Sequence, residues 1–135
     1  MRKPWATAAL IVFWIVVIIL LAGYSRNEVA RRSDISAAVR ATGGNPANAR
    51  AKVLQYGCSS CHTIPGIPEA HGTVGPPLVS FAMRTYIAGE VANTPANLTH
   101  WIQHPHEIEP HTAMPEMGVT EQDSRDIAAY LYTLK

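Results

Sequence analysis

The sequence predicts a small all-α domain preceded by one membrane-spanning helix. Residues 4–25 contain no charged side chain, so all 11 basic and 10 acidic residues of the 135-residue chain lie outside this stretch. Start signals for helices stand near residues 45 and 120, and the proline- and glycine-rich segment between them shows no strand pattern. We expect an anchor at 1–24, a linker at 25–44 and one domain at 45–135.

Composition and charge argue against two classes of protein. Two cysteines are too few for a disulfide-rich secreted scaffold. The basic residues form no run of the kind that binds nucleic acid. Residues 1–44 hold six basic and two acidic side chains, whereas residues 45–135 hold five basic and eight acidic ones. We therefore expect the basic part to contact the membrane and the acidic part to form the folded domain.

Residues 6–24 predict the membrane span. As a helix this segment is about 28 Å long, close to the roughly 30 Å of a bilayer's hydrocarbon core. A cleaved signal peptide is the alternative, but its apolar region is usually shorter, and no convincing small-x-small cleavage site follows. We expect a retained anchor in contact with lipid. The residues expected at its two interfaces are Arg2, Lys3, Trp5, Tyr24 and Arg26.

Residues 25–44 predict a solvated spacer. The stretch from Glu28 to Arg40 contains helix formers and no Pro or Gly, and Thr42-Gly43-Gly44 then ends any helix. The spacer reaches about 30 Å if it is helical and about 65 Å if it is extended.

The domain is expected to begin with a helix. Asn45 is a good capping residue, and Pro46 suits the first helical position. This helix would run to about Gly57. The side chains that it is expected to bury are Val53, Leu54 and Tyr56.

A second helix is expected at the end of the domain. Thr120, with Asp123 three residues later, resembles a capping box. Apolar residues then recur at intervals of three and four, which predicts a buried stripe. The stripe comprises Ile127, Tyr130, Leu131 and Leu134. Because so small a domain with so much loop buries a limited core, we expect an additional covalent or metal-based link to stabilise its fold.

The motif Cys58-Ser59-Ser60-Cys61-His62 indicates what this stabilising link is. C-x-x-C-H is the attachment site of a c-type haem, because two thiols on one helical turn reach two vinyl groups and the next histidine faces the iron. A zinc site needs two more ligands, and the chain has no third cysteine. A thioredoxin-like dithiol needs an α/β sheet, which the sequence does not predict. The histidine directly after Cys61 favours haem.

The run Gly75-Pro76-Pro77-Leu78 is a candidate support for the histidine. A turn here can bring a carbonyl, that of Pro76 in our prediction, to the Nδ1–H group of His62. Such a bond would fix the ring and raise its basicity. A simple turn without this role is the alternative.

A methionine near the last helix is expected to be the second axial ligand. Met114 precedes Pro115 in the loop before the final helix, and the proline would stiffen that loop. A lone methionine is more often core filler or exposed. Met117 is the alternative ligand, and Met83 is a weaker one because it follows an apolar segment.

Together these features resemble a class I cytochrome c domain. The resemblance covers residues 45–135 and rests on the attachment motif, the Gly-Pro-x-Leu turn, the Met-Pro loop and the final Asp-Ile-Ala-Ala-Tyr-Leu helix. Residues 93–102 are similar to the cytochrome c domain fused to subunit II of some haem-copper oxidases. The oxidase part itself is missing here, so the comparison stops at the cytochrome domain.

The resemblance implies a fold in which the first and last helices of the domain cross and Pro/Gly-rich loops envelop one covalent haem c. Leu54 would then meet Ile127 and Tyr130. The resemblance also implies that Trp101 and Arg84 bind the haem propionates through an indole N–H and a guanidinium. From the residues alone, a core tryptophan and a surface arginine are the alternatives.

Five further histidines follow the motif. His100 and His104 are four residues apart, a spacing that binds metal on a helix face, but Pro105 interrupts that face. We expect all five to be solvated loop residues. The other three are His71, His106 and His111.

The expected function is the transport of single electrons. An iron held by His62 and Met114 has no open coordination position and changes oxidation state with little rearrangement, so we expect no enzymatic activity. An open position would instead indicate a haem enzyme or gas sensor. A structural subunit with an unproductive haem is a third hypothesis.

Haem attachment of this kind resembles a process outside the bacterial cytoplasmic membrane. We therefore expect a single-pass inner-membrane protein with its N-terminus inside and its domain in the periplasm or on the outer face. The expected partner is a redox complex of the membrane: an oxidase, a quinol-oxidising complex or a periplasmic dehydrogenase. The chain would be its subunit or its tethered donor.

Overall fold

The computed structural model describes the backbone of residues 4–135 and the side chains of residues 8–135. The interfacial roles predicted for Arg2, Lys3 and the side chain of Trp5 lie outside these described residues. The chain divides into two compact units, of which one ends at Ser33 and the other spans Asp34–Lys135.

Helix α1 spans Pro4–Thr42 and so includes most of both the predicted anchor and the predicted linker. Among the described residues it is the one helix that is long and apolar enough to cross a membrane, a property that signal sequences share. Large apolar side chains are exposed at nearly every position from Leu10 to Leu21, and therefore on all sides of the helix. This pattern is compatible with a single-pass membrane anchor.

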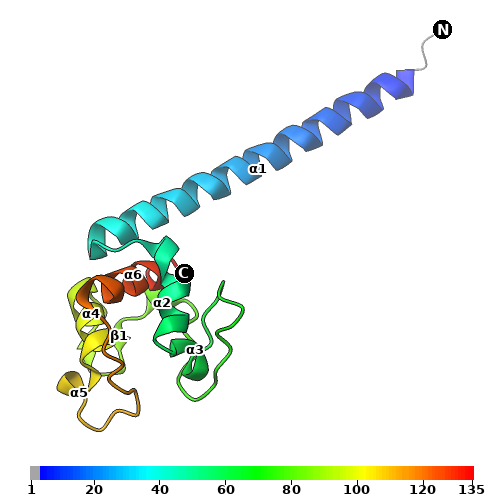
Figure 1. The fold of residues 1–135 in the computed structure, drawn as a ribbon. Coiled ribbons are helices and arrows are strands. Elements are labelled where there is room, and N and C mark those ends of the chain that lie inside the picture. Colours follow the sequence, from blue (N-terminus) through cyan, green and yellow to red (C-terminus); the bar gives the residue numbers. More distant parts are fainter. Residues whose placement is uncertain (1–3) are drawn as a thin grey trace. The chain divides into compact units, whose positions relative to one another are not determined.

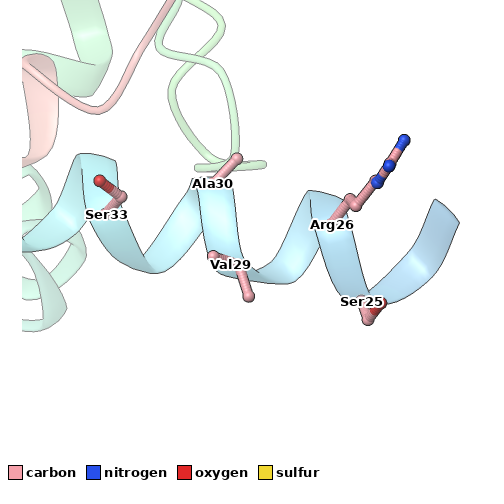
Figure 2. Close-up of a pocket in the computed structure, with 5 residues that line it drawn as sticks. All are labelled: Ser25, Arg26, Val29, Ala30 and Ser33. Carbon is pink, nitrogen blue, oxygen red and sulfur yellow. The ribbon is translucent and has the colours of Figure 1, made fainter. Parts of the chain in front are cut away.

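The surface of the first unit has one shallow hollow near its end. Figure 2 shows the residues that line it, all of them from successive turns of α1. The hollow is therefore a gap between side chains of one helix and not an enclosed binding cavity. The lining residues are Ser25, Arg26, Val29, Ala30 and Ser33.

The second unit is mostly helical, so the predicted all-α fold class is confirmed (Figure 1). It adds an antiparallel hairpin whose two strands have two residues each, too few to leave an alternating pattern in the sequence. The elements that follow α1 are η1 (Pro46–Asn48), α2 (Ala49–Gln55), α3 (Cys58–Cys61), η2 (Phe81–Met83), β1 (Tyr86–Ile87), β2 (Val91–Ala92), α4 (Pro95–Gln103), α5 (Pro105–Ile108) and α6 (Glu121–Leu131).

The core of this unit forms where α6 packs against α2 and α4 (Figure 1). Of the predicted stripe on α6, Ile127 and Leu131 are buried, and the other two residues pack against the core while partly exposed. The predicted burial of Leu54 is wrong, because its side chain is 38% exposed. On α2 the residues that share the buried face are Ala49 and Val53, four positions apart, and Leu54 lies one step further round the helix.

The predicted caps of both terminal helices are present. The Asn45 side chain accepts a hydrogen bond from the backbone N–H of Ala47, and Pro46 follows it in the first turn. The Thr120 side chain accepts from the backbone N–H of Asp123 at the start of α6. The first helix differs in detail, since it opens with the 3₁₀ turn η1 before α2.

The last turns of α1 belong to the second unit. Ala38 and Thr42 are buried, and the hydroxyl of Thr42 donates to the carbonyl of Ala38. Lys135, at the end of the chain, forms an ion pair with Asp34. The solvated-spacer interpretation is therefore wrong for this part of the linker, because its small side chains allow close packing.

Gly44 lies directly against α6. A Cβ atom at this position would sit 2.0 Å from the carbonyl oxygen of Arg125 and 2.6 Å from the backbone nitrogen of Asp126. Neither backbone atom can move without disturbing α6, so only glycine fits here.

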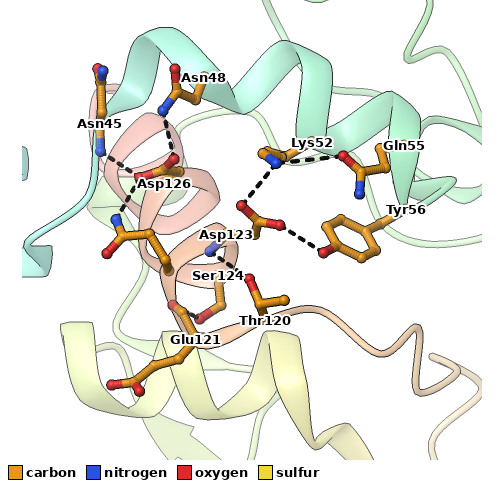
Figure 3. Close-up of polar contacts among 11 residues, drawn as sticks. Asn45, Asn48, Lys52, Gln55, Tyr56, Thr120, Glu121, Asp123, Ser124 and Asp126 are labelled. Carbon is orange, nitrogen blue, oxygen red and sulfur yellow. Dashed lines mark hydrogen bonds and ion pairs between the residues drawn. The ribbon is translucent and has the colours of Figure 1, made fainter.

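Asp126 joins the start of the domain to α6 (Figure 3). Its carboxylate is buried and accepts hydrogen bonds from the backbone N–H of Asn45 at 2.7 Å and the side-chain amide of Asn48 at 2.8 Å. Gln122 donates a third bond at 3.0 Å. Burial alone would raise the pKa of Asp126, but these donors outweigh it and hold the pKa below its ordinary value.

We expect Asp126→Asn to remove a pH-dependent part of the stability. Because the folded-state pKa is depressed, the carboxylate's contribution is complete above the unfolded pKa of about 3.9 and is lost as pH falls through the folded value. The variant should lose about 1–3 kcal/mol of unfolding free energy at pH 7, as expected when a buried, charge-assisted network is broken. Denaturant unfolding at several pH values measures this.

The exposed Glu90, in the hairpin turn, provides the control. Glu90→Gln should leave the unfolding free energy and its acid dependence unchanged. An Asp126→Asn protein with the wild-type acid dependence would show that Asp126 does not carry this contribution.

Candidate functional site

Both cysteines of the attachment motif lie on one helical turn. Gly57, with φ at +70°, ends the preceding segment and starts α3, which spans Cys58–Cys61. The two thiols are free and half-buried. Residues three apart on a helix share a face, so both sulfurs are available to one ligand. Burial raises the pKa of the Cys58 thiol.

His62 follows α3 in extended conformation, and its ring contacts the turn formed by residues 75–78, here called the proline turn. The Nδ1 atom lies 2.8 Å from the carbonyl oxygen of Pro76, the contact that the sequence predicted. Since a carbonyl only accepts, Nδ1 carries the proton and donates, which leaves the lone pair of Nε2 for a metal.

The proline turn is clamped to the chain on both sides of His62. The N–H of Gly75 donates to the carbonyl of Cys61 at 2.8 Å, and the N–H of Leu78 donates to that of Thr63 at 2.8 Å. A Cβ atom on Gly75 would lie 2.4 Å from Cε1 of His62 and 2.8 Å from its Nδ1. The turn therefore forms a close-fitting support for the imidazole. Sequence reasoning missed the clamp, although the glycine before the two prolines was its signal.

The candidate methionines differ in burial. Met114 is half-buried and packs against the core, and its backbone N–H donates to the hydroxyl of Thr112. Met117 is 44% exposed, near Gly57, and Met83 is 71% exposed. The greater burial of Met114 favours it, but which sulfur binds iron stays a prediction.

Trp101 and Arg84 lie in different surroundings. Trp101, on α4, is buried in the core. Arg84 donates to the carbonyl oxygens of Pro77 and Val79, and its guanidinium lies 5.2 Å from the ring centre of Phe81. The propionate roles of Trp101 and Arg84 stay predictions.

The expectation that all five further histidines lie in loops is wrong for His100 and His106, which lie on α4 and α5 and pair with glutamates. Nε2 of His100 lies 3.1 Å from a Glu107 oxygen, and the His100 and His104 rings are 5.6 Å apart. These groups border an open hollow over α4 and α5. Within the part of the chain that the structure describes, no group of three or more His, Cys, Asp or Glu residues is arranged to hold a metal ion.

The residues around His62 fit a covalently attached haem. Cys58 and Cys61 are free thiols on one turn, the Nδ1 atom of His62 faces the carbonyl of Pro76, and Gly75 leaves room for the ring. These are the donor types that c-type haem requires.

Comparison with known proteins gives one match. The family model for cytochrome c matches residues 47–135, about two thirds of the chain. No curated protein and no solved structure matches the chain, so the resemblance to oxidase-fused cytochrome domains stays a prediction. The chain belongs to the cytochrome c family.

Proposed function

We propose that this protein is a membrane-anchored c-type cytochrome with one haem, and that it carries single electrons in a respiratory chain. The observation that carries this proposal is the His62 site, where an oriented imidazole directly follows two free thiols on one turn. Family membership supports the assignment, because the cytochrome c family implies a covalent haem and electron transfer. Bound haem supplies a one-electron iron couple.

The protein's own residues bind and orient the haem. Cys58 and Cys61 would form the thioether links, and His62 would bind the iron. The carbonyl of Pro76 holds the imidazole in the required tautomer. Met114 would be the second protein ligand of the iron, so that the iron would have no place for a substrate. We therefore propose a carrier and not an enzyme.

Carbon monoxide distinguishes a carrier from a gas sensor or haem enzyme. The reduced wild-type protein, purified in mild detergent, should show no spectral change under carbon monoxide, because both axial positions are filled. Rapid formation of a carbonyl complex would overturn the carrier assignment and favour the sensor.

We also propose attachment to the bacterial inner membrane, with the haem domain on the periplasmic side. Helix α1 is compatible with a single-pass anchor, and covalent haem attachment of this kind resembles a process outside that membrane. Because the compact unit begins at Asp34, only residues 25–33 separate it from the predicted span. Those nine residues reach about 14 Å as a helix and about 30 Å fully extended. So short a connection favours a partner within the membrane: an oxidase, a quinol-oxidising complex or a dehydrogenase. The anchor would be excluded if protein purified from membranes were found to lack its first 24 residues.

The electron-exchange face should be weakly charged. The stretches expected around the haem edge are 59–60, 64–68 and 113–115, none of which contains a charged residue. The nearest acidic side chains are Glu69 and Glu116. Glu69 forms an ion pair with Arg50, which reduces its net field.

We expect the oxidation rate to change less than about tenfold between low and high salt, because electrostatic steering needs a strongly charged patch. Stopped-flow oxidation by one anionic and one cationic small oxidant measures this, and neither should show a steep salt dependence. Steep dependences of opposite sign would contradict a weakly charged face and would show that the acidic side chains of residues 107–121 act at the site of electron exchange.

A further inference from the structure

Arg84 links the turn that supports His62 to the rest of the domain. It directly follows η2, and its guanidinium donates to the carbonyl oxygens of both Pro77 and Val79. The charged group also lies over the Phe81 ring, 5.2 Å from its centre, where a cation is favoured. These contacts hold two carbonyls on either side of Leu78.

The turn needs an external donor because of its prolines. Pro76 and Pro77 have no backbone N–H, so neither residue can be anchored by donating a hydrogen bond. The clamps at Gly75 and Leu78 lie on either side of them. Of the two prolines, Pro76 uses its carbonyl to accept from His62, and Pro77 uses its carbonyl to accept from Arg84.

Hydrogen bonds from Asn93, which in turn accepts from Tyr132, hold the backbone around Arg84 in place. The side-chain amide of Asn93 donates to the carbonyl oxygens of Phe81 and Arg84, both at 3.0 Å. The hydroxyl of Tyr132 donates to the Asn93 side-chain oxygen at 2.8 Å. A continuous set of hydrogen bonds thus runs from Tyr132 to the proline turn.

We propose that Arg84 is a positioning residue for the axial histidine. By holding the carbonyls of Pro77 and Val79, it keeps the carbonyl of Pro76 on Nδ1 of His62. The strength of that bond sets the basicity of the imidazole as a ligand. This proposal rests on the proposed haem-binding function, and it assigns to Arg84 an action through the turn in place of the propionate role implied by the family.

Hydrogen exchange at the ligand itself tests the proposal. In the reduced, haem-loaded full-length protein, NMR follows the exchange of the His62 Nδ1–H proton, and electrochemistry gives the potential. Arg84→Ala should accelerate this exchange about tenfold or more, because losing two charge-assisted hydrogen bonds makes opening of the turn easier by about that factor. Arg84→Lys should also accelerate it, because the lysine ammonium ends a shorter side chain than the Nη2 atom that donates to both carbonyls, and it lacks the flat guanidinium that lies over Phe81.

Arg50 provides the control for the loss of a positive charge. Arg50→Ala also removes one positive charge, from an exposed pair with Glu69, and should leave the exchange unchanged. Wild-type exchange in both Arg84 variants, with a potential that changes in Arg84→Ala and returns in Arg84→Lys, would overturn the proposal in favour of the propionate role. If Arg84→Ala fails to fold, the exchange rate of the His62 Nδ1–H proton in Arg84→Lys alone tests the proposal, and a wild-type rate there overturns it. A wild-type protein without haem would instead contradict the proposed function.

Discussion

Replacing Met114 by alanine is expected to abolish the sulfur-to-iron charge-transfer band of the oxidised protein and to lower its reduction potential. A thioether ligand favours the reduced iron, so its loss should shift the potential by on the order of 0.1 V, a fraction of the roughly 0.8 V that axial ligands span. The reduced variant should also bind carbon monoxide, because one axial position becomes free. Visible spectroscopy and redox titration measure these changes.

Met117 provides the matched control, since it lies in the same loop and is more exposed than Met114. Met117→Ala should keep the band and the wild-type potential. The reverse pattern, with Met117 required and Met114 dispensable, would identify Met117 as the ligand.

The second large effect is expected for Gly75→Ala. The added methyl group would lie 2.4 Å from Cε1 of His62, so either the ring or the proline turn must move. Either movement lengthens the bond between Nδ1 and Pro76, and overpacking of this kind costs about 1–3 kcal/mol. We expect a lower yield of haem-loaded protein and a weakened histidine ligand. Haem content per chain and the visible spectrum report both.

Gly89 separates this effect from general backbone strain. It has φ at +84°, so alanine is strained there, but nothing lies within 4 Å of the added Cβ. Gly89→Ala should lower the stability without altering the haem spectrum. An unaltered spectrum in Gly75→Ala as well would contradict the supporting role of the proline turn.

The parts of the fold that depend on local signals could be predicted from the sequence. The caps at Asn45 and Thr120 and the stripe beginning at Ile127 follow from spacing along one helix. The contact between His62 and Pro76 was predictable for a different reason. It depends on a short motif whose residue types suit one chemistry.

The remaining features depend on contacts between segments far apart in the chain. Gly44 is required by the backbone of α6, some 80 residues later, and nothing near it in the sequence indicates this. The bonds from Asn45 and Asn48 to Asp126 arise in the same way. Leu54 was assigned to the core because it is apolar, but the orientation of α2 decides which face is buried. The Arg84 contacts are an exception, because they join residues close in sequence; they could not be predicted because their acceptors are backbone carbonyls, which carry no sequence signature.

The covalent attachment of one haem can be tested with the mass of the intact, denatured protein from membranes. We expect one species with the mass of the 14.7 kDa chain plus one haem, and the haem should resist acid-acetone extraction because Cys58 and Cys61 hold it covalently. Replacing both cysteines by serine should remove the added mass. A colourless wild-type protein with the mass of the bare chain would contradict the account.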